Sequence, residues 1–246
     1  MQKLTDIIAI NAKETVTIVG SGGKTTLLWR FAEFYRQGRT LVTTTTKIFH
    51  PHNRQYDDYR DSRTLLDQPV NNGATLAGEP LSTEEGLKLS GLDPQVLEQG
   101  KGLFDRVLIE GDGARQLPLK GWADSEPVVP YYTDCTIGVV TLWPLGKQVD
   151  ASIVFRLPLF CVISGAVEGD ALTVGHVAAA ITHPNGLWKG SRGRRVLFIN
   201  QTEDEKGREQ ARQLCERLSP DVLQNLSMVV AGSARDNQGE VLWRKT

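Results

Sequence analysis

The fold is decided by one stretch of the sequence, Thr15-Val16-Thr17-Ile18-Val19-Gly20-Ser21-Gly22-Gly23-Lys24-Thr25-Thr26. Residues 15–19 are all β-branched, which is typical of a strand. Gly20 to Gly23 interrupt that strand, and from Lys24 to Gln37 apolar residues recur at helical spacing. The stretch therefore predicts a strand, a glycine-rich turn and a helix in direct succession.

A glycine-rich turn between a strand and a helix is the context of a phosphate-binding loop. Glycines let successive backbone N–H groups turn toward one anion, and the helix N-terminus adds partial positive charge. In this interpretation Lys24 reaches the β- and γ-phosphates of a nucleotide, and the Thr25 hydroxyl binds Mg²⁺. The predicted nucleotide-binding residues of the loop are Gly20, Ser21, Gly22, Gly23, Lys24, Thr25 and Thr26.

The loop departs from the full P-loop pattern GxxxxGK[ST], which expects glycine where this chain has Ile18. The form present is the shortened GxxGKT, which is similar to the loops of Mur-type ligases and of deviant P-loop ATPases and GTPases. The alternative is a glycine-rich turn that carries a Lys-Thr pair by chance.

A second apolar strand is predicted over Arg106–Glu110, and it runs into Gly111-Asp112-Gly113. A carboxylate at the end of a strand beside the loop can hold the water shell of Mg²⁺ or polarise an attacking water. We expect Asp112 to bind the metal and Glu110 to orient the water, with the reverse assignment as the alternative. The candidate catalytic residues are therefore Lys24, Glu110 and Asp112.

Four threonines and a lysine, Thr43 to Lys47, follow a strand predicted over Arg39–Thr44. In many P-loop proteins a threonine at this point contacts Mg²⁺ or the γ-phosphate and orders a switch loop. Thr45 therefore joins Thr25 and Asp112 as a candidate metal ligand, and Lys47 is a candidate for binding anions. The alternative is that these threonines are ordinary strand residues.

Two later stretches add candidates. Arg115 and Lys120, in the loop after Asp112, are placed to bind an anionic substrate near the γ-phosphate, or else are solvated loop cations. Asn200-Gln201-Thr202-Glu203 resembles the N-K-x-D motif with which GTPases recognise guanine, and Ser233-Ala234-Arg235 stands where those proteins carry S-A-K. Asn200 is thus a candidate base-binding residue. Glu203 replaces the guanine-reading aspartate, so the choice between ATP and GTP stays open.

Composition limits the classes of partner. The 246 residues contain 28 Lys and Arg and 29 Asp and Glu, a formal net charge of −1. Without a basic field, nucleic acid and anionic membranes are excluded as main partners. No apolar run approaches the ~18 residues of a membrane span, and no signal peptide is recognised. With three cysteines and no CxxC motif, we expect free thiols and a cytoplasmic protein.

Short strands alternate with helical segments along the chain. We expect a single domain over residues 1–246 with an α/β fold: a P-loop NTPase-like, doubly wound, mostly parallel sheet with helices on both faces. Irregular insertions are expected near 47–103 and 113–135. Within the first of these, Ser82-Thr83-Glu84-Glu85 matches a capping box and predicts a helix that reaches Leu89.

The motifs taken together resemble the YqeC family, which is described as accessory to selenium-dependent molybdenum hydroxylases. The resemblance rests on VGSGGKTT, LVTTTTKIF, the block VLIEGDGARQLPLKGWADSEPVVP and FINQTEDE, in that order. It implies a bacterial cytoplasmic protein that acts in selenium or molybdenum cofactor maturation, with a molybdenum hydroxylase or its maturation proteins as partner. By this resemblance the family motif positions are Lys24, Thr25, Glu110, Asp112, Lys120 and Glu126. Glu126 joins Lys47, Arg115 and Lys120 as a candidate substrate-binding residue.

The sequence thus predicts a Mg²⁺-dependent nucleotide-binding protein, an ATPase or GTPase whose hydrolysis times a partner interaction. Two alternatives stay open. One is a kinase or ligase that acts on a small anionic substrate. The other is a nucleotide-binding scaffold without chemistry.

Overall fold

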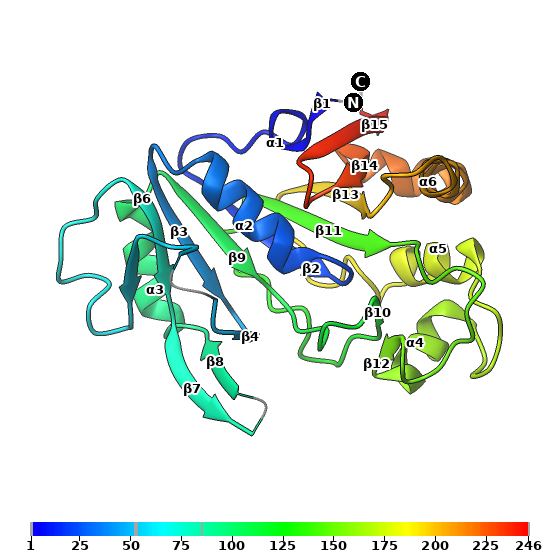
Figure 1. The fold of residues 1–246 in the computed structure, drawn as a ribbon, viewed down its shortest axis with the longest axis horizontal. Coiled ribbons are helices and arrows are strands. Elements are labelled where there is room, and N and C mark those ends of the chain that lie inside the picture. Colours follow the sequence, from blue (N-terminus) through cyan, green and yellow to red (C-terminus); the bar gives the residue numbers. More distant parts are fainter. Residues whose placement is uncertain (1, 52–53, 85, 246) are drawn as a thin grey trace.

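A mostly parallel sheet forms the centre of the computed structural model, which describes residues 2–51, 54–84 and 86–245 (Figure 1). Among these residues the sheet has ten strands, in the spatial order β1-β15-β14-β13-β11-β2-β9-β3-β6-β5. The run from β14 to β5 is parallel, whereas β15 is antiparallel to β14 and β1 to β15. The bounds are β1 (Gln2–Lys3), β2 (Glu14–Gly20), β3 (Arg39–Thr44), β5 (Asp58–Arg60), β6 (Gly73–Ala77), β9 (Arg106–Glu110), β11 (Cys135–Thr141), β13 (Arg194–Asn200), β14 (Met228–Ser233) and β15 (Gln238–Arg244).

Helices cover both faces of this sheet. In β13, Val196 and Phe198 pack in the same core cluster as the apolar face of α2, whereas Leu197 and Ile199 pack with α5 and α6. Alternate residues of a strand point to opposite faces, so these helices lie on opposite sides. The α/β class with a large, mostly parallel sheet is therefore confirmed. The helices are α1 (Leu4–Ile7), α2 (Lys24–Phe34), α3 (Pro94–Gly100), α4 (Leu157–Ser164), α5 (Val174–Thr182), α6 (Glu205–Arg217) and α7 (Pro220–Gln224), with a 3₁₀ turn η1 (Lys101–Leu103).

Two small sheets accompany the main one. The strands β4 (Lys47–Phe49), β7 (Glu79–Thr83) and β8 (Gly86–Ser90) pair antiparallel in the order β4-β8-β7, and the β7–β8 hairpin projects from the body (Figure 1). The strands β10 (Leu119–Lys120) and β12 (Val154–Phe155) pair in parallel. Thus stretch 47–103, where insertions were expected, holds β4 to β8 and α3, whereas β10 is the regular element described within 113–135.

The prediction of a helix from Ser82 to Leu89 is wrong. Ser82 and Thr83 end β7, and Gly86 begins β8 with a φ of +115°. A glycine with positive φ suits a tight turn and weakens a helix interior. The partner strand β4 then pairs with β8 from Lys47 to Phe49. Tertiary pairing therefore prevails over the local capping pattern, of which Ser82 to Glu84 lie on a strand and a turn and Glu85 lies outside the described residues.

The strand order places the ends of β2 and β9 side by side. Ile18 in β2 is paired with Glu110 in β9, and Thr44 in β3 flanks the same Glu110 from the other side. After β2 the chain first forms β3, β5, β6 and β9 on one side of this strand, and then forms β11, β13 and β14 on its other side. The sheet therefore has a topological switch point beside β2. Open α/β sheets bind ligands outside the carboxyl ends of strands at such a point.

In the described residues no helix is long and apolar enough to cross a bilayer.

Candidate functional site

The loop from Gly20 to Thr26 joins β2 to α2 and needs glycine for two reasons. Gly20 and Gly23 have φ values of +102° and +127°, a region that L side chains rarely adopt. A Cβ atom on Gly20 would lie 2.1 Å from the Val139 carbonyl oxygen, and one on Gly23 would lie 2.0 Å from Asn200 Nδ2. Backbone conformation and close packing therefore both exclude a side chain at these positions.

A run of backbone donors opens at the start of α2. In the described part of the chain no acceptor takes the N–H groups of Gly22, Gly23, Lys24, Thr25 and Thr26. Gly23, the N-cap residue, offers no side-chain oxygen to satisfy them. Successive N–H groups of this kind, at the positive end of a helix, form an anion-binding site.

Lys24 is buried beneath the loop, with 4% of its surface exposed. Its Nζ donates to the Gly20 carbonyl oxygen at 2.7 Å and lies 3.4 Å from Asp112 Oδ1 and 3.7 Å from Glu110 Oε1. Burial alone would lower the pKa of Lys24, but the charges of Asp112 and Glu110 outweigh it and raise that pKa above its usual value. Lys24 is therefore a permanent cation in the floor of the site.

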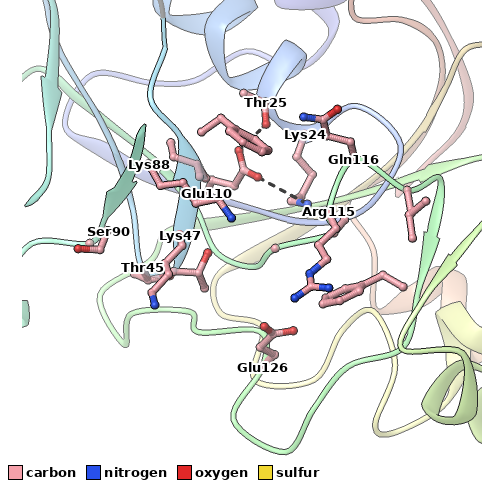
Figure 2. A pocket seen from close by; sticks show the side chains of 18 of the residues that line it. Lys24, Thr25, Thr45, Lys47, Lys88, Ser90, Glu110, Arg115, Gln116 and Glu126 are labelled. Carbon is pink, nitrogen blue, oxygen red and sulfur yellow. Dashed lines mark hydrogen bonds and ion pairs between the residues drawn. The ribbon is translucent and has the colours of Figure 1, made fainter. Parts of the chain in front are cut away.

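Thr25 and Glu110 meet at the surface of the same site. Thr25 Oγ1 donates to Glu110 Oε2 at 2.8 Å (Figure 2). Burial raises the pKa of Glu110, and the Lys24 charge and the Thr25 hydrogen bond offset part of that rise. No group of three or more His, Cys, Asp or Glu side chains able to hold a metal occurs among the described residues. The pair fits Mg²⁺, which takes one or two protein oxygens and completes its shell with phosphate and water.

Asp112 lies away from this pair, fully buried behind the loop. Both of its carboxylate oxygens accept the Gly20 N–H at 3.1 Å, and Oδ2 also accepts from Lys120 Nζ at 3.0 Å and Trp122 Nε1 at 2.7 Å. The structure thus brings Glu110, rather than Asp112, to Thr25. This geometry makes Glu110, and not Asp112, the candidate metal ligand beside Thr25, and Asp112 holds the start of the loop, a role that neither assignment gave it.

A chain of buried charges runs from Asp112 toward the far side of the site. Lys120 is 1% exposed and donates to Asp112, to the Gly113 carbonyl oxygen at 2.6 Å and to Glu126 Oε2 at 3.0 Å. Arg156 in turn binds both carboxylate oxygens of Glu126, with Nη2 at 3.0 Å from Oε1. Lys120, expected to contact substrate, is therefore placed inside an ion network.

Replacing Glu126 by glutamine should give a pH-dependent loss of stability. Burial raises the pKa of Glu126, but the hydrogen bond from Arg156 and the charge of Lys120 prevail, so the net pKa is lowered. A carboxyl with a lowered folded-state pKa stabilises the protein above its unfolded value and loses that contribution in acid. We expect Glu126→Gln to lower the free energy of unfolding by about 1–3 kcal/mol at neutral pH, and the difference from wild type to shrink as pH falls.

Urea unfolding at a series of pH values measures this, with the exposed Glu168→Gln as control. A deficit in Glu126→Gln that stays constant from neutral pH into acid would contradict the pKa argument.

Lys24, Thr25, Glu110, Glu126 and Arg156 line a cavity of about 920 Å³, whereas the buried Asp112 and Lys120 lie behind its wall. Figure 2 shows Lys47 and Lys88 on the side of β4 and β8, and Arg115 and Gln116 on the opposite loop. Thr45 lines the same cavity and donates its hydroxyl to the Val128 carbonyl oxygen at 2.7 Å. Of the sequence-predicted residues, the structure brings together at this cavity Gly22, Gly23, Lys24, Thr25, Thr26, Thr45, Lys47, Glu110, Arg115 and Glu126.

Asn200 lies next to the loop but does not line the cavity. Its Nδ2 donates to the Gly22 carbonyl oxygen at 2.8 Å, and its Oδ1 accepts from the Ala234 N–H at 2.9 Å. The structure thus joins the carboxyl ends of β13 and β14 to the loop. A contact between Asn200 and a base stays a prediction.

Several residues of the site were missed in the sequence, among them Lys88, Phe155, Arg156 and Trp122. Phe155 and Arg156 line the cavity beside Arg115, and Trp122 donates to Asp112. Trp122 stood inside a stretch already singled out, but neither its indole donor nor its partner was named. Phe155 and Arg156 belong to no recognisable motif, because their place depends on the pairing of β12 with β10.

Comparisons with known proteins agree with these motifs. The family model described as YqeC protein matches residues 16–158, which include the loop, Glu110 and Arg156. A protein of Escherichia coli (strain K12), named "Uncharacterized protein YqeC", is 32% identical over 203 residues, covering 80% of this chain and 79% of its own. No solved structure matches the chain. The family match and this identity together establish that the chain belongs to the YqeC family.

Proposed function

We propose that this protein binds a nucleoside triphosphate with Mg²⁺ at the Gly20–Thr26 loop and hydrolyses it. The observation that carries the proposal is the set of N–H groups of residues 22–26, which lack an acceptor among the described residues. They stand beside Lys24 and the Thr25–Glu110 pair. Amide donors, one lysine and a hydroxyl–carboxylate pair are what a phosphate chain with Mg²⁺ requires.

The sheet topology supports the same proposal. The loop follows β2, and the strand that carries Glu110 is its hydrogen-bonded neighbour. On the other side of β2 the parallel strands follow in the order β11, β13 and β14. Asn200 is the last residue of β13, and Ser233 is the last residue of β14. A P-loop NTPase-like fold requires such a succession of phosphate-binding, carboxylate-bearing and base-reading edges along one rim of the sheet. We therefore include that fold in the proposal.

In the proposed mechanism the backbone N–H groups of residues 22–26 hold the β- and γ-phosphates. Lys24 exchanges the Gly20 carbonyl oxygen for a phosphate oxygen. Thr25 and Glu110 would hold the metal and its water shell, while Asp112 keeps the loop in place through the Gly20 N–H. Mg²⁺, when bound, neutralises charge that develops on the phosphates.

Glu110→Gln tests the chemistry separately from binding. Glutamine keeps the shape of the side chain and removes its charge, so the metal loses its carboxylate neighbour. We expect phosphate release from the preferred nucleotide to fall about 10²–10³-fold, while Mg²⁺-free nucleotide affinity changes little. Release is measured under saturating Mg²⁺ and nucleotide, with Glu168→Gln as the matched control because Glu168 is exposed and lies outside the cavity.

The scaffold alternative predicts the opposite result. A protein that binds nucleotide without chemistry would release no phosphate, and Glu110→Gln would match wild type in every assay. Absence of phosphate release from the wild type therefore rejects the hydrolytic proposal, and equal measurable rates in Glu110→Gln and wild type reject the role given to Glu110.

The partner is proposed from the family resemblance alone. A molybdenum hydroxylase, or a protein that matures its cofactor, should then bind this chain in a nucleotide-dependent manner. Co-purification from a cell that makes such an enzyme, with and without a non-hydrolysable nucleotide analogue, tests this. Equal recovery of the partner with and without the analogue would contradict a nucleotide-dependent interaction.

A further inference from the structure

The nucleotide end of the cavity is already electrically balanced. In the described residues, three buried or half-buried cations alternate with three carboxylates in one connected cluster, and their formal charges cancel. The members of the cluster are Lys24, Glu110, Asp112, Lys120, Glu126 and Arg156.

Three further cations, Lys47, Lys88 and Arg115, line the cavity outside that cluster, and Lys88 Nζ lies over the Phe49 ring at 5.0 Å from its centre. Lys47 opens β4 on one wall, and Arg115 lies in the loop on the opposite wall (Figure 2). Within the described chain no carboxylate lies within 4.0 Å of either side chain, and both line the cavity that contains Glu110 and the loop. The part of the cavity away from the phosphate-binding loop therefore has an excess of positive charge.

Arg115 is an exposed residue whose guanidinium lies over an aromatic ring. Its guanidinium carbon lies 5.3 Å from the centre of the Phe155 ring, and that of Arg156 lies 4.6 Å from the same ring. Arg115 and Gln116 have φ values of +48° and +62°, so two successive non-glycine residues adopt the left-handed region. Such conformations are sparsely populated and cluster at ligand sites. The loop thus presents a guanidinium without a counter-ion to the cavity.

We propose that Arg115 and Lys47 form a second anion subsite, which binds the phosphate or carboxylate group of a small-molecule substrate beside the nucleotide. A guanidinium recognises either group through two parallel hydrogen bonds, and a lysine adds a point charge. The cavity volume of about 920 Å³ lies near the top of the ~300–1,000 Å³ range of ligand pockets. This inference rests on the proposed function for its assignment of the other end to a nucleotide.

The test counts bound anions. Equilibrium dialysis with radiolabelled inorganic phosphate, without nucleotide, measures equivalents bound per chain. Wild type should bind two, one at the loop and one between Lys47 and Arg115. Lys24→Ala should bind one, and Lys47→Ala with Arg115→Ala should bind one and keep its Mg²⁺–nucleotide affinity within about twofold. The control, Lys206→Ala with Arg63→Ala, removes two exposed cations outside the cavity and should bind two.

Each departure from this pattern has a definite meaning. A single equivalent that disappears in Lys24→Ala and survives in the Lys47 and Arg115 double variant overturns the second subsite and leaves the proposed function standing. A single equivalent of phosphate that is still bound by Lys24→Ala but not by the double variant supports the subsite and contradicts the proposed function. Loss of nucleotide affinity in the double variant would assign both cations to the nucleotide and overturn the inference, as would the absence of any bound phosphate.

Discussion

Lys24→Ala is expected to weaken nucleotide binding by about 2–5 kcal/mol, or about 30- to 5,000-fold in Kd. The ammonium group of Lys24 is the permanent cation beneath the loop, held within 3.7 Å of two carboxylates. Without it, those carboxylates face the phosphates with no cation between them. Loss of an attraction and exposure of a repulsion act in the same direction, which makes this the largest effect on binding that we predict.

Isothermal titration with a non-hydrolysable triphosphate and Mg²⁺ measures the change. Lys206→Ala, an exposed lysine on α6, is the control and should match wild type. Far-UV circular dichroism shows whether Lys24→Ala is folded. Because alanine leaves a buried gap, Lys24→Met provides a second variant that keeps the aliphatic stem and removes the charge. Wild-type affinity in a folded Lys24→Met variant would contradict the role given to this side chain.

Asp112→Asn is expected to cause the largest loss of stability. Asp112 is fully buried and neutralises Lys120, which is itself 1% exposed. Removing one partner from a buried ion pair costs about 3–5 kcal/mol, because the other charge stays in a medium of low dielectric constant. For a chain of this length the melting temperature should fall by roughly 6–20 °C.

Thermal unfolding with Asp124→Asn as control measures this, because Asp124 is an exposed aspartate in the same loop.

The ion pair between Asp112 and Lys120 leads to a second prediction. Combining Asp112→Asn with Lys120→Met should cost less than the sum of the two single changes, since the double variant leaves neither charge unpaired. If Asp112 served as a metal ligand rather than as an anchor, Asp112→Asn would change the Mg²⁺ dependence and leave the melting temperature of the free protein within experimental error.

The sequence was sufficient for the features that depend on local chemistry. The strand–turn–helix unit around Gly20 to Thr26 was predicted correctly, because β-branched residues, glycines and helical periodicity each act over a few positions. Glu110 was found at the end of an apolar strand for the same reason. The helix expected at 82–89 failed because a non-local strand, β4, decides the conformation there.

The connections within the site could not be read in the same way. Nothing in the sequence shows that Asp112 faces the Gly20 N–H and Trp122, whereas Glu110, two residues earlier, faces Thr25. The position of Lys120 in the sequence, in a loop after Asp112, suggests a cation that binds substrate, but its side chain lies buried between two carboxylates. A one-dimensional pattern identifies which residues bear charge. Packing determines which of those charges form ion pairs inside the protein and which remain available to a ligand.

The central claim is that the Gly20–Thr26 loop binds a nucleotide with Mg²⁺. Thermal unfolding of the wild-type protein with non-hydrolysable ATP and GTP analogues, each with and without Mg²⁺, tests it most directly. A ligand at one hundred times its Kd stabilises the folded state by about 2.7 kcal/mol. We predict a melting temperature that rises with the concentration of one purine nucleotide, rises further with Mg²⁺, and does not change for Lys24→Met. A melting temperature that is unaffected by millimolar concentrations of every nucleotide would contradict the account.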